Sequence, residues 1–252
     1  RINHILEIHS EFSGLTEFLM MKLNFINSKW IKKIIFISEA LRKKFTIVDK
    51  KKSIVLHDAV DIKNFVLKNT RKKNKIKNVA YVGSFHKGKG VEMICELAPK
   101  FKKLNFNIFG DPLNHDYPKF PNLKFHGHID YREVPKKLES SDILLLPSAE
   151  VQYGRSNSVN ISEYNSPLKM FDYLASGKII VSSKHDGICE ILKHNYNCVF
   201  TDGFDVNDWV NSINSILNNK HDLNFIRKNS IKTAKKYTWE KRVKKIVNLK
   251  YK

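Results

Sequence analysis

Short apolar segments alternate with segments of helical periodicity along this chain, and this alternation constrains the fold more than any other feature. From residue 78 onward, the strand-like segments are residues 79–83, 106–109, 123–126, 143–146, 179–182 and 198–200. Helical patterns at residues 91–101, 134–138 and 168–176 lie between some of them. Strands that alternate with helices form a parallel sheet covered on both faces. We therefore predict an α/β fold in which residues 78–236 form a complete, six-stranded, Rossmann-like doubly wound domain.

The first 66 residues repeat this alternation on a smaller scale. Strands are predicted at residues 3–9, 33–37 and 53–57, with an amphipathic helix after the first strand and a second helix that begins at Ser38. The apolar side of the first helix is expected to carry Phe18, Leu19 and Leu23. Three strands are too few for a complete domain. Residues 1–66 are therefore predicted to form a partial Rossmann-like domain, and the initial Arg1 suggests that the chain starts inside a longer coding sequence.

A strongly basic segment separates the two groups of strands. Residues 67–77 carry six basic side chains and no acidic or aromatic one, which is typical of a solvated linker. Nucleic-acid binding is the alternative, but no aromatic residue is interleaved to stack on bases. We place the domain boundary at this linker. At the other end of the chain, residues 237–252 form a predicted closing helix whose apolar face carries Trp239, Val243, Ile246 and Val247.

The net charge and the cysteines limit the partners and the compartment. Forty-five Lys and Arg against 25 Asp and Glu give a formal charge of +20, which favours phosphates, nucleic acid or an anionic membrane surface, although Lys is spread so widely that compositional bias is an alternative. Cys95, Cys189 and Cys198 lack metal-ligand spacing, so we expect no metal site and a reducing compartment. No apolar run is long enough to span a bilayer. The prediction is a cytoplasmic protein, with peripheral contact at the inner face of the membrane as an option.

A helix start near residue 166 is suited to an anion. Ser166 is a natural N-cap, Pro167 suits the first helical position, and Gly177 suits the end of the helix. The free N–H groups of the first turn and the Lys169 ammonium favour a phosphate there. Asp172, one turn further along, could accept hydrogen bonds from sugar hydroxyls. An ordinary capped core helix with a solvated Lys–Asp pair explains the same residues equally well.

A glycine-rich loop follows the first strand of the larger domain. Residues 83–90 read GSFHKGKG, which is a near miss to a P-loop because Gly90 stands where Ser or Thr would hold magnesium. The spacing of its glycines is also wrong for a dinucleotide fingerprint. In a doubly wound fold this loop and the helix near residue 166 belong to strand ends of one sheet, so they are expected to form one pocket.

Several of these segments resemble one known family. The sequence SPLKMFDYLASGK at residues 166–178 resembles the nucleotide-sugar motif of the GT-B glycosyltransferases of family 4, in the subgroup with an SPLK pattern. The Tyr-Val-Gly to Lys-Gly pattern at residues 81–90 is similar to that family's diphosphate loop, and FHGHI at residues 125–129 to its base-reading loop. His9, SEAL at 38–41 and DAVD at 58–61 resemble the second half of its N-terminal domain. The resemblance therefore implies a GT-B fold that lacks the first half of that domain, with a closing helix that crosses back to it.

The resemblance also implies roles for particular residues. Lys89 and Lys169 would stabilise the leaving diphosphate, His9 would face the donor sugar, and Asp172 would bind the ribose. The other implied substrate-binding positions are Gly83, Ser84, His86, Ile129, Tyr164, Ser166, Pro167 and Leu168. Tyr164 stands where many relatives have a glutamate, and Ser84 where many have Arg, a charge that His86, Lys87 or Arg155 could supply.

The activity implied by the resemblance is transfer of a sugar, with retention of configuration, from a nucleotide diphosphate sugar of UDP or GDP type. No cofactor and no metal are expected besides this donor. The acceptor would be a glycan or a lipid-linked molecule, and no nucleic acid is expected as a partner. A catalytically incomplete nucleotide-sugar-binding fragment is the first alternative, and a basic nucleic-acid-binding protein is the second.

Overall fold

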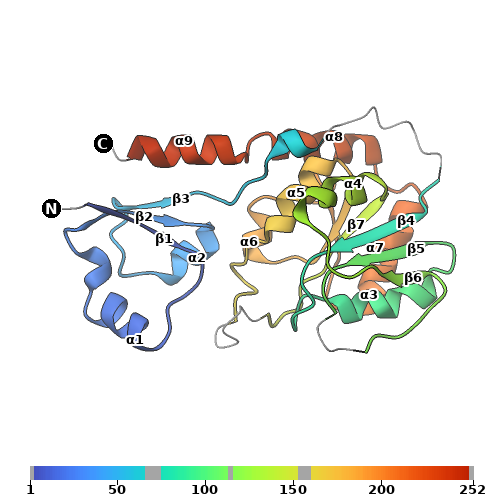
Figure 1. Ribbon diagram of the computed structural model, residues 1–252, viewed down its shortest axis with the longest axis horizontal. Coiled ribbons are helices and arrows are strands. Elements are labelled where there is room, and N and C mark those ends of the chain that lie inside the picture. Colours follow the sequence, from blue (N-terminus) through green and yellow to red (C-terminus); the bar gives the residue numbers. More distant parts are fainter. Residues whose placement is uncertain (1–2, 66–74, 113–115, 153–159, 250–252) are drawn as a thin grey trace.

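A computed structural model describes residues 3–65, 75–112, 116–152 and 160–249 (Figure 1). The strands form two separate parallel sheets, one with three strands near the amino terminus and one with six strands in the rest of the chain. Most of the predicted linker and Arg155 lie outside the described residues.

The larger sheet has the predicted doubly wound order. Its strands run in the order β6-β5-β4-β7-β8-β9, and every neighbouring pair is parallel. They are β4 (Asn78–Val82), β5 (Asn105–Phe109), β6 (Leu123–Phe125), β7 (Ile143–Leu146), β8 (Ile179–Ser182) and β9 (Val199–Phe200). The chain moves outward in one direction from β4 to β6 and in the other from β7 to β9. The edge outside the carboxyl ends of β4 and β7 is therefore the position where such folds bind ligands.

Helices cover both faces of this sheet, which explains why the central strand β7 is apolar throughout (Figure 1). On one face, α3 (Val91–Leu97) and α7 (Val206–Leu217) share a core cluster with Ile143 and Leu145 of β7. On the other face, α4 (Val134–Glu139), α5 (Leu168–Ser176) and α6 (Asp186–Cys189) share a second cluster with Leu144 and Leu146. Helix α8 (Leu223–Ala234) packs beside α5. Alternate side chains of one strand thus belong to different cores.

The smaller sheet contains β1 (His4–Ile8), β2 (Ile31–Phe36) and β3 (Ser53–Val55) in that order. Helix α2 (Glu39–Lys44) begins as predicted after Ser38, whose Oγ accepts a hydrogen bond of 3.1 Å from Leu41 N. The segment between β1 and β2 differs from the prediction. It forms α1 (Gly14–Glu17), a π-helical turn η1 (Phe18–Lys22) and a 3-10 turn η2 (Phe25–Asn27). Phe18, Leu19 and Leu23 are exposed instead of buried, because this segment packs through Ile26, Met20 and Met21.

The closing helix α9 (Trp239–Leu249) lies against the smaller sheet, but not with the predicted face (Figure 1). Trp239, Val243 and Val247 are exposed, Ile246 is half-buried, and Arg242 is the buried residue of the helix at 8 % exposure. Its Nη2 lies 2.7 Å from Glu7 Oε1, and its Nε donates to His57 O at 3.0 Å. The guanidinium faces inward, where these acceptors form charge-assisted hydrogen bonds with it.

Polar contacts join the two sheets at their carboxyl ends. The carboxylate of Glu190, just after α6, accepts hydrogen bonds of 2.8 Å from the backbone N–H groups of both Glu39 and Ala40 at the start of α2. Ser38 Oγ donates to the carbonyl of Tyr164 at 3.0 Å. A carboxylate of the large domain therefore satisfies N–H groups that the helix itself leaves free.

Candidate functional site

The start of α5 leaves polar groups without partners. The structure places Pro167 at the N-cap position, with φ −69° and ψ 125°, and not Ser166 as predicted. The Pro167 carbonyl accepts from Met170 N at 2.9 Å, so Ser166 is one residue too early to cap the helix. Ser166 Oγ is buried and has no hydrogen-bond partner among the described residues. Gly177 ends the helix in the left-handed conformation as predicted, with φ 63°.

Lys169 extends from the first turn of α5 to the end of β4. Its ammonium donates a hydrogen bond of 2.7 Å to Tyr81 Oη and lies 3.9 Å from the centroid of the Tyr81 ring. Tyr81 Oη in turn donates to the carbonyl of Ser84 at 2.7 Å. Gly83, with φ 154°, lies beside it, and a Cβ at this position would lie 2.3 Å from Lys169 Nζ and displace the end of the lysine. Gly83 is thus the residue type that allows the lysine to reach the strand end.

The charge of Lys89 acts on Lys169 at the candidate site. Burial lowers the pKa of Lys89, and burial together with the Lys89 charge lowers the pKa of Lys169 well below its usual range. Neither ammonium has a carboxylate partner within 4 Å in the described part of the chain. Two neighbouring ammonium groups without a counter-ion repel each other, so an anion between them would restore favourable charge on both. The geometry therefore suits a phosphate.

Asp172 lies one turn further along α5. It is 9 % exposed, and burial raises the pKa of its carboxyl to about 6. Tyr131 lies in the 3-10 turn η5 (Tyr131–Glu133) after β6, and its Oη donates a hydrogen bond of 2.9 Å to Asp172 Oδ1. This hydrogen bond lowers the pKa of Asp172 and so partly opposes the effect of burial. A carboxylate with one satisfied oxygen can accept further hydrogen bonds from hydroxyl groups.

The glycine-rich loop is held against residues 147–152. A Cβ at Gly90, with φ 75°, would lie 2.4 Å from Pro147 Cβ, and one at Gly88, with φ 85°, would lie 2.5 Å from the Val151 carbonyl oxygen. The Gly88 carbonyl also accepts from Ala149 N at 3.0 Å. A cavity of about 610 Å³ on this side of the loop is lined by Gly88, Gly90 and residues 147–151. It does not include Lys169 or Asp172, so we locate the candidate site by the charged groups.

Four other predicted site residues, together with Pro167, differ in how far their side chains are exposed to solvent. Ser84 and His86 are exposed in the loop. Ile129 is half-buried against the core cluster of α4 and α5. Leu168 is exposed at the start of α5, next to the half-buried Pro167.

Two predicted site residues, Tyr164 and His9, lie in or beside the smaller domain. The Tyr164 side chain is buried in the core of the smaller domain, and its Oη accepts from Glu11 N at 3.4 Å. This position makes Tyr164 a packing residue at the junction of the domains. His9 follows β1 and is exposed, with Nε2 2.7 Å from Glu7 Oε1. Within the described residues, no hydrogen bond connects His9 to Lys89, Lys169 or Asp172.

Sequence reasoning missed three tyrosines that position the site. Tyr81 holds Lys169, Tyr131 holds Asp172, and Tyr173 Oη accepts from Val82 N at 2.9 Å at the end of β4. Tyr81 stands within the Tyr-Val-Gly pattern, which was the available signal. Tyr173 likewise stands within the motif at residues 166–178, whereas Tyr131 has no such signal, because its phenol group acts on a partner 41 residues away.

The described ranges contain no cluster of metal ligands and no membrane-spanning helix. In this part of the chain, no group of three or more His, Cys, Asp or Glu side chains is placed to hold a metal ion. None of the helices described is both long and apolar enough to cross a membrane. Cys95 and Cys198 are buried, Cys189 is half-buried, and all three are free thiols.

Comparison with known proteins gives a family match over most of the chain. A family model described as glycosyl transferases group 1 matches residues 63–236. An uncharacterized glycosyltransferase of Methanocaldococcus jannaschii is 24 % identical over 170 residues, which are 64 % of this chain and 44 % of that protein. A protein from the cps region of Klebsiella pneumoniae is 32 % identical over 90 residues, 34 % of this chain and 25 % of that protein. The matches thus span less than half the length of these curated relatives.

Solved structures share the fold. Anabaena HepE in complex with UDP superposes with a TM-score of 0.77 at 17 % identity, over 97 % of this chain and 71 % of that one. A glycosyltransferase from Rickettsia africae superposes with a TM-score of 0.75 at 16 % identity, over 97 % of this chain and 69 % of that one. The described chain therefore has the GT-B type of fold, with a complete doubly wound carboxyl-terminal domain.

Proposed function

Because the chain belongs to the glycosyl transferases group 1 family, we propose that it transfers a glycosyl group from a nucleotide diphosphate sugar to a glycan or lipid-linked acceptor. Within that family we assign it to the family-4 subgroup with an SPLK motif, and we propose a reaction that retains the anomeric configuration. The observation that carries the proposal is the pair Lys89 and Lys169, two ammonium groups without a described carboxylate partner at the carboxyl edge of a doubly wound sheet.

The chemistry follows from the charges. In glycosyl transfer the bond between the sugar and the diphosphate breaks, and negative charge develops on the leaving diphosphate. Preorganised ammonium and N–H groups stabilise that charge most strongly where water is excluded. Lys89, Lys169 and the first turn of α5 would supply these groups, and Gly83, Ser84 and His86 would shape the loop around the phosphates.

The remaining assignments concern the nucleoside and the sugar. Asp172 would accept hydrogen bonds from the ribose, and the backbone near Ile129 would contact the base. His9 would face the donor sugar from the smaller domain. UDP is the first candidate nucleotide because the related structure of Anabaena HepE contains it, and GDP is the second. A nucleotide-sugar-binding protein without transferase activity is the alternative.

We also propose that the chain works in the cytoplasm and can rest on an anionic membrane. The support is the formal charge of +20 together with the exposed side chains Leu15, Phe18, Leu19 and Leu23 in one segment. Sedimentation with vesicles of acidic phospholipid at low salt is expected, and sedimentation that is equal with neutral vesicles would contradict it.

Calorimetric titration with UDP, GDP and ADP tests the donor site. Lys89→Ala and Lys169→Met are each expected to weaken binding of the preferred nucleotide by about ten- to a hundredfold, because each removes a charge-assisted hydrogen bond worth about 1.5–3 kcal/mol. Lys136→Ala is the matched control, since Lys136 is exposed on α4 and its loss changes the net charge equally. Equal weakening by all three substitutions would indicate nonspecific attraction and refute the site.

A second assay separates transfer from binding alone. Turnover of the corresponding UDP-sugar, measured as release of UDP, is expected for the enzyme. Tight UDP binding without any release in the presence of candidate acceptors would favour the non-catalytic alternative.

A further inference from the structure

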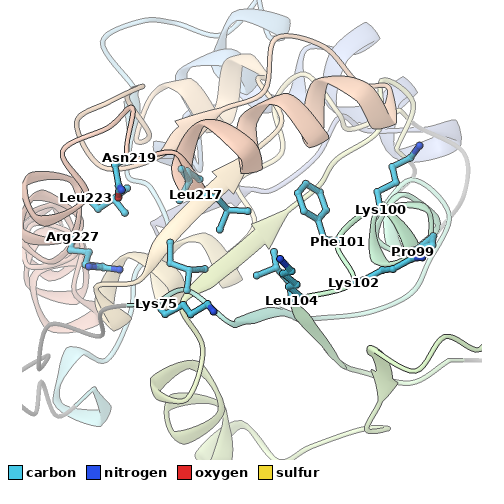
Figure 2. Close-up of a pocket in the computed structure, with 13 residues that line it drawn as sticks. Lys75, Pro99, Lys100, Phe101, Lys102, Leu104, Leu217, Asn219, Leu223 and Arg227 are labelled. Atoms are coloured by element: carbon cyan, nitrogen blue, oxygen red, sulfur yellow. The ribbon is translucent and has the colours of Figure 1, made fainter.

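A second cavity lies at the opposite end of the large sheet from Lys89 and Lys169 (Figure 2). Its volume is about 590 Å³, within the range of about 300–1,000 Å³ that is typical of small-molecule sites. Ile76 and Leu104, which line it, precede β4 and β5, whereas Gly83 follows β4. The cavity is therefore at the amino ends of the strands. The proposed glycosyl transfer takes place at their carboxyl ends and does not use this cavity.

The floor of this cavity is apolar. Phe101, Leu104 and Ile216 are buried members of the core cluster on the α3 and α7 face of the sheet. Leu217, at the end of α7, and Leu223, at the start of α8, are half-buried and pack on the same cluster. The cavity thus reaches apolar surface that is continuous with the core, and an apolar group placed there would be removed from water.

The rim is cationic. Lys75, Lys100, Lys102, Lys103 and Arg227 line the cavity, and among the described residues no Asp or Glu side chain does so. None of these five cations forms an ion pair with a carboxylate among the described residues. Figure 2 shows Arg227 and Lys75 on one side of the cavity and Lys100 and Lys102 on the other. An anionic group would therefore be attracted to either side of an apolar floor.

Arg227 is the least solvated of these cations. It is half-buried on α8, and burial lowers the pKa of its guanidinium, while the charge of nearby Asp142 opposes this effect. A partly desolvated guanidinium gains more from an anion than an exposed lysine does, because its interaction is less screened by water.

The lining disfavours several ligand classes. Sugars are usually held by carboxylates and amides, but in the described part of the lining Asn219 is the one side-chain amide and there is no carboxylate. Nucleobases are often held by stacking on exposed aromatic faces, but Phe101, the one aromatic residue in the described lining, is buried in the floor. A ligand with an alkyl body and one anionic head matches both the floor and the rim.

We propose that this cavity binds an anionic amphiphile, that is, an alkyl chain with a phosphate or carboxylate head. The alkyl chain of this ligand lies over Phe101, Leu104 and Leu217, and its anionic head contacts Arg227 and Lys75. This proposal is independent of the glycosyltransferase assignment, because it uses none of the residues at the carboxyl edge.

Calorimetric titration of the full chain with dodecyl phosphate, below its micelle-forming concentration, tests the proposal. We expect saturable binding with one site. Arg227→Gln is expected to weaken it by about ten- to a hundredfold, as loss of a hydrogen bond to a charged group would. Lys228→Gln is the matched control, because Lys228 is exposed on the same helix, outside the lining, and carries the same charge. It is expected to change the affinity less than twofold.

Further titrations separate the head from the chain. Dodecanoate in place of dodecyl phosphate identifies the preferred anion, and binding of either supports the site. Inorganic phosphate alone and neutral dodecyl maltoside are both expected to bind at least tenfold more weakly. Lys75→Gln provides a second rim variant if Arg227→Gln melts at a lower temperature. Absence of saturable binding, equal effects of Arg227→Gln and Lys228→Gln, or equal affinity for dodecyl maltoside would each overturn the proposal.

Discussion

Replacing Asp172 with Asn is expected to stabilise the folded chain while weakening nucleotide binding. Burial raises the pKa of Asp172 from 3.8 to about 6, so the folded state disfavours the ionised carboxylate above that pH. Each tenfold change in proton affinity is worth about 1.4 kcal/mol, and the cost of keeping this carboxylate ionised is therefore about 3 kcal/mol at pH 8. Asn is neutral, nearly isosteric, and can still accept the hydrogen bond from Tyr131.

The pH dependence has a definite sign. A group whose pKa is raised on folding destabilises the folded state as the pH rises from its unfolded pKa, 3.8, through its folded pKa, about 6. At pH 4 the carboxyl is largely protonated in the folded state, so Asp172→Asn should have nearly the same stability as the original chain. At pH 8 the variant should be more stable by up to about 3 kcal/mol.

Urea denaturation at pH 4, 6 and 8 measures this difference, with Asp130→Asn as the control. Asp130 is exposed, and its Arg132 partner lowers the pKa of its carboxyl, so its replacement should not stabilise the chain. Parallel UDP titrations should show weaker binding for Asp172→Asn than for the original chain at pH 8. The reasoning would be refuted if the stability difference between Asp172→Asn and the original chain were no larger at pH 8 than at pH 4.

Three further predictions concern contacts that position the site and the domains. Gly83→Ala should reduce both the melting temperature and the UDP affinity, because the added Cβ would displace Lys169. Gly14→Ala is the control, because Gly14 also has a positive φ, 57°, but faces open space. It should leave the UDP affinity unchanged. Binding of UDP should take up protons, because the lowered pKa of Lys169 must rise beside a phosphate. The UDP affinity should therefore fall as the pH increases above the lowered pKa of free Lys169. Calorimetry in buffers of different ionisation enthalpy should detect the proton uptake. Arg242→Met should lower the free energy of unfolding by about 2 kcal/mol in urea titrations, by removing hydrogen bonds to Glu7 and His57; an unchanged midpoint would contradict this role.

The sequence predicted the larger sheet well because its signals are local. Residues 143–146 and 179–182 coincide with β7 and β8, and the other strands lie within one or two residues of their predicted ends. A run of apolar residues bounded by turn residues identifies a buried strand whatever its partners are. The smaller domain was less predictable, since the segment from Gly14 to Asn27 has apolar residues at helical spacing on more than one side.

The helical faces show where such signals fail. In α9, the spacing of Trp239, Val243 and Val247 predicts a buried stripe, but the structure buries Arg242 instead. Periodicity identifies which side chains share a face, and only the partner decides which face is turned inward. Here the partner offers the Glu7 carboxylate and the His57 carbonyl, more than 180 residues away in the chain.

The sequence alone was enough to predict the order of the strands, the helix boundaries at Ser38 and Gly177, and the loop and helix that carry the lysines. These depend on residues that are close together in the chain. The tertiary structure alone decided that Lys169 reaches Tyr81 beside Gly83, that Tyr131 holds Asp172, and that burial changes the pKa values of Lys169 and Asp172. Those properties depend on desolvation and on contacts between distant residues, because a side chain loses water and gains partners only when separate elements pack together.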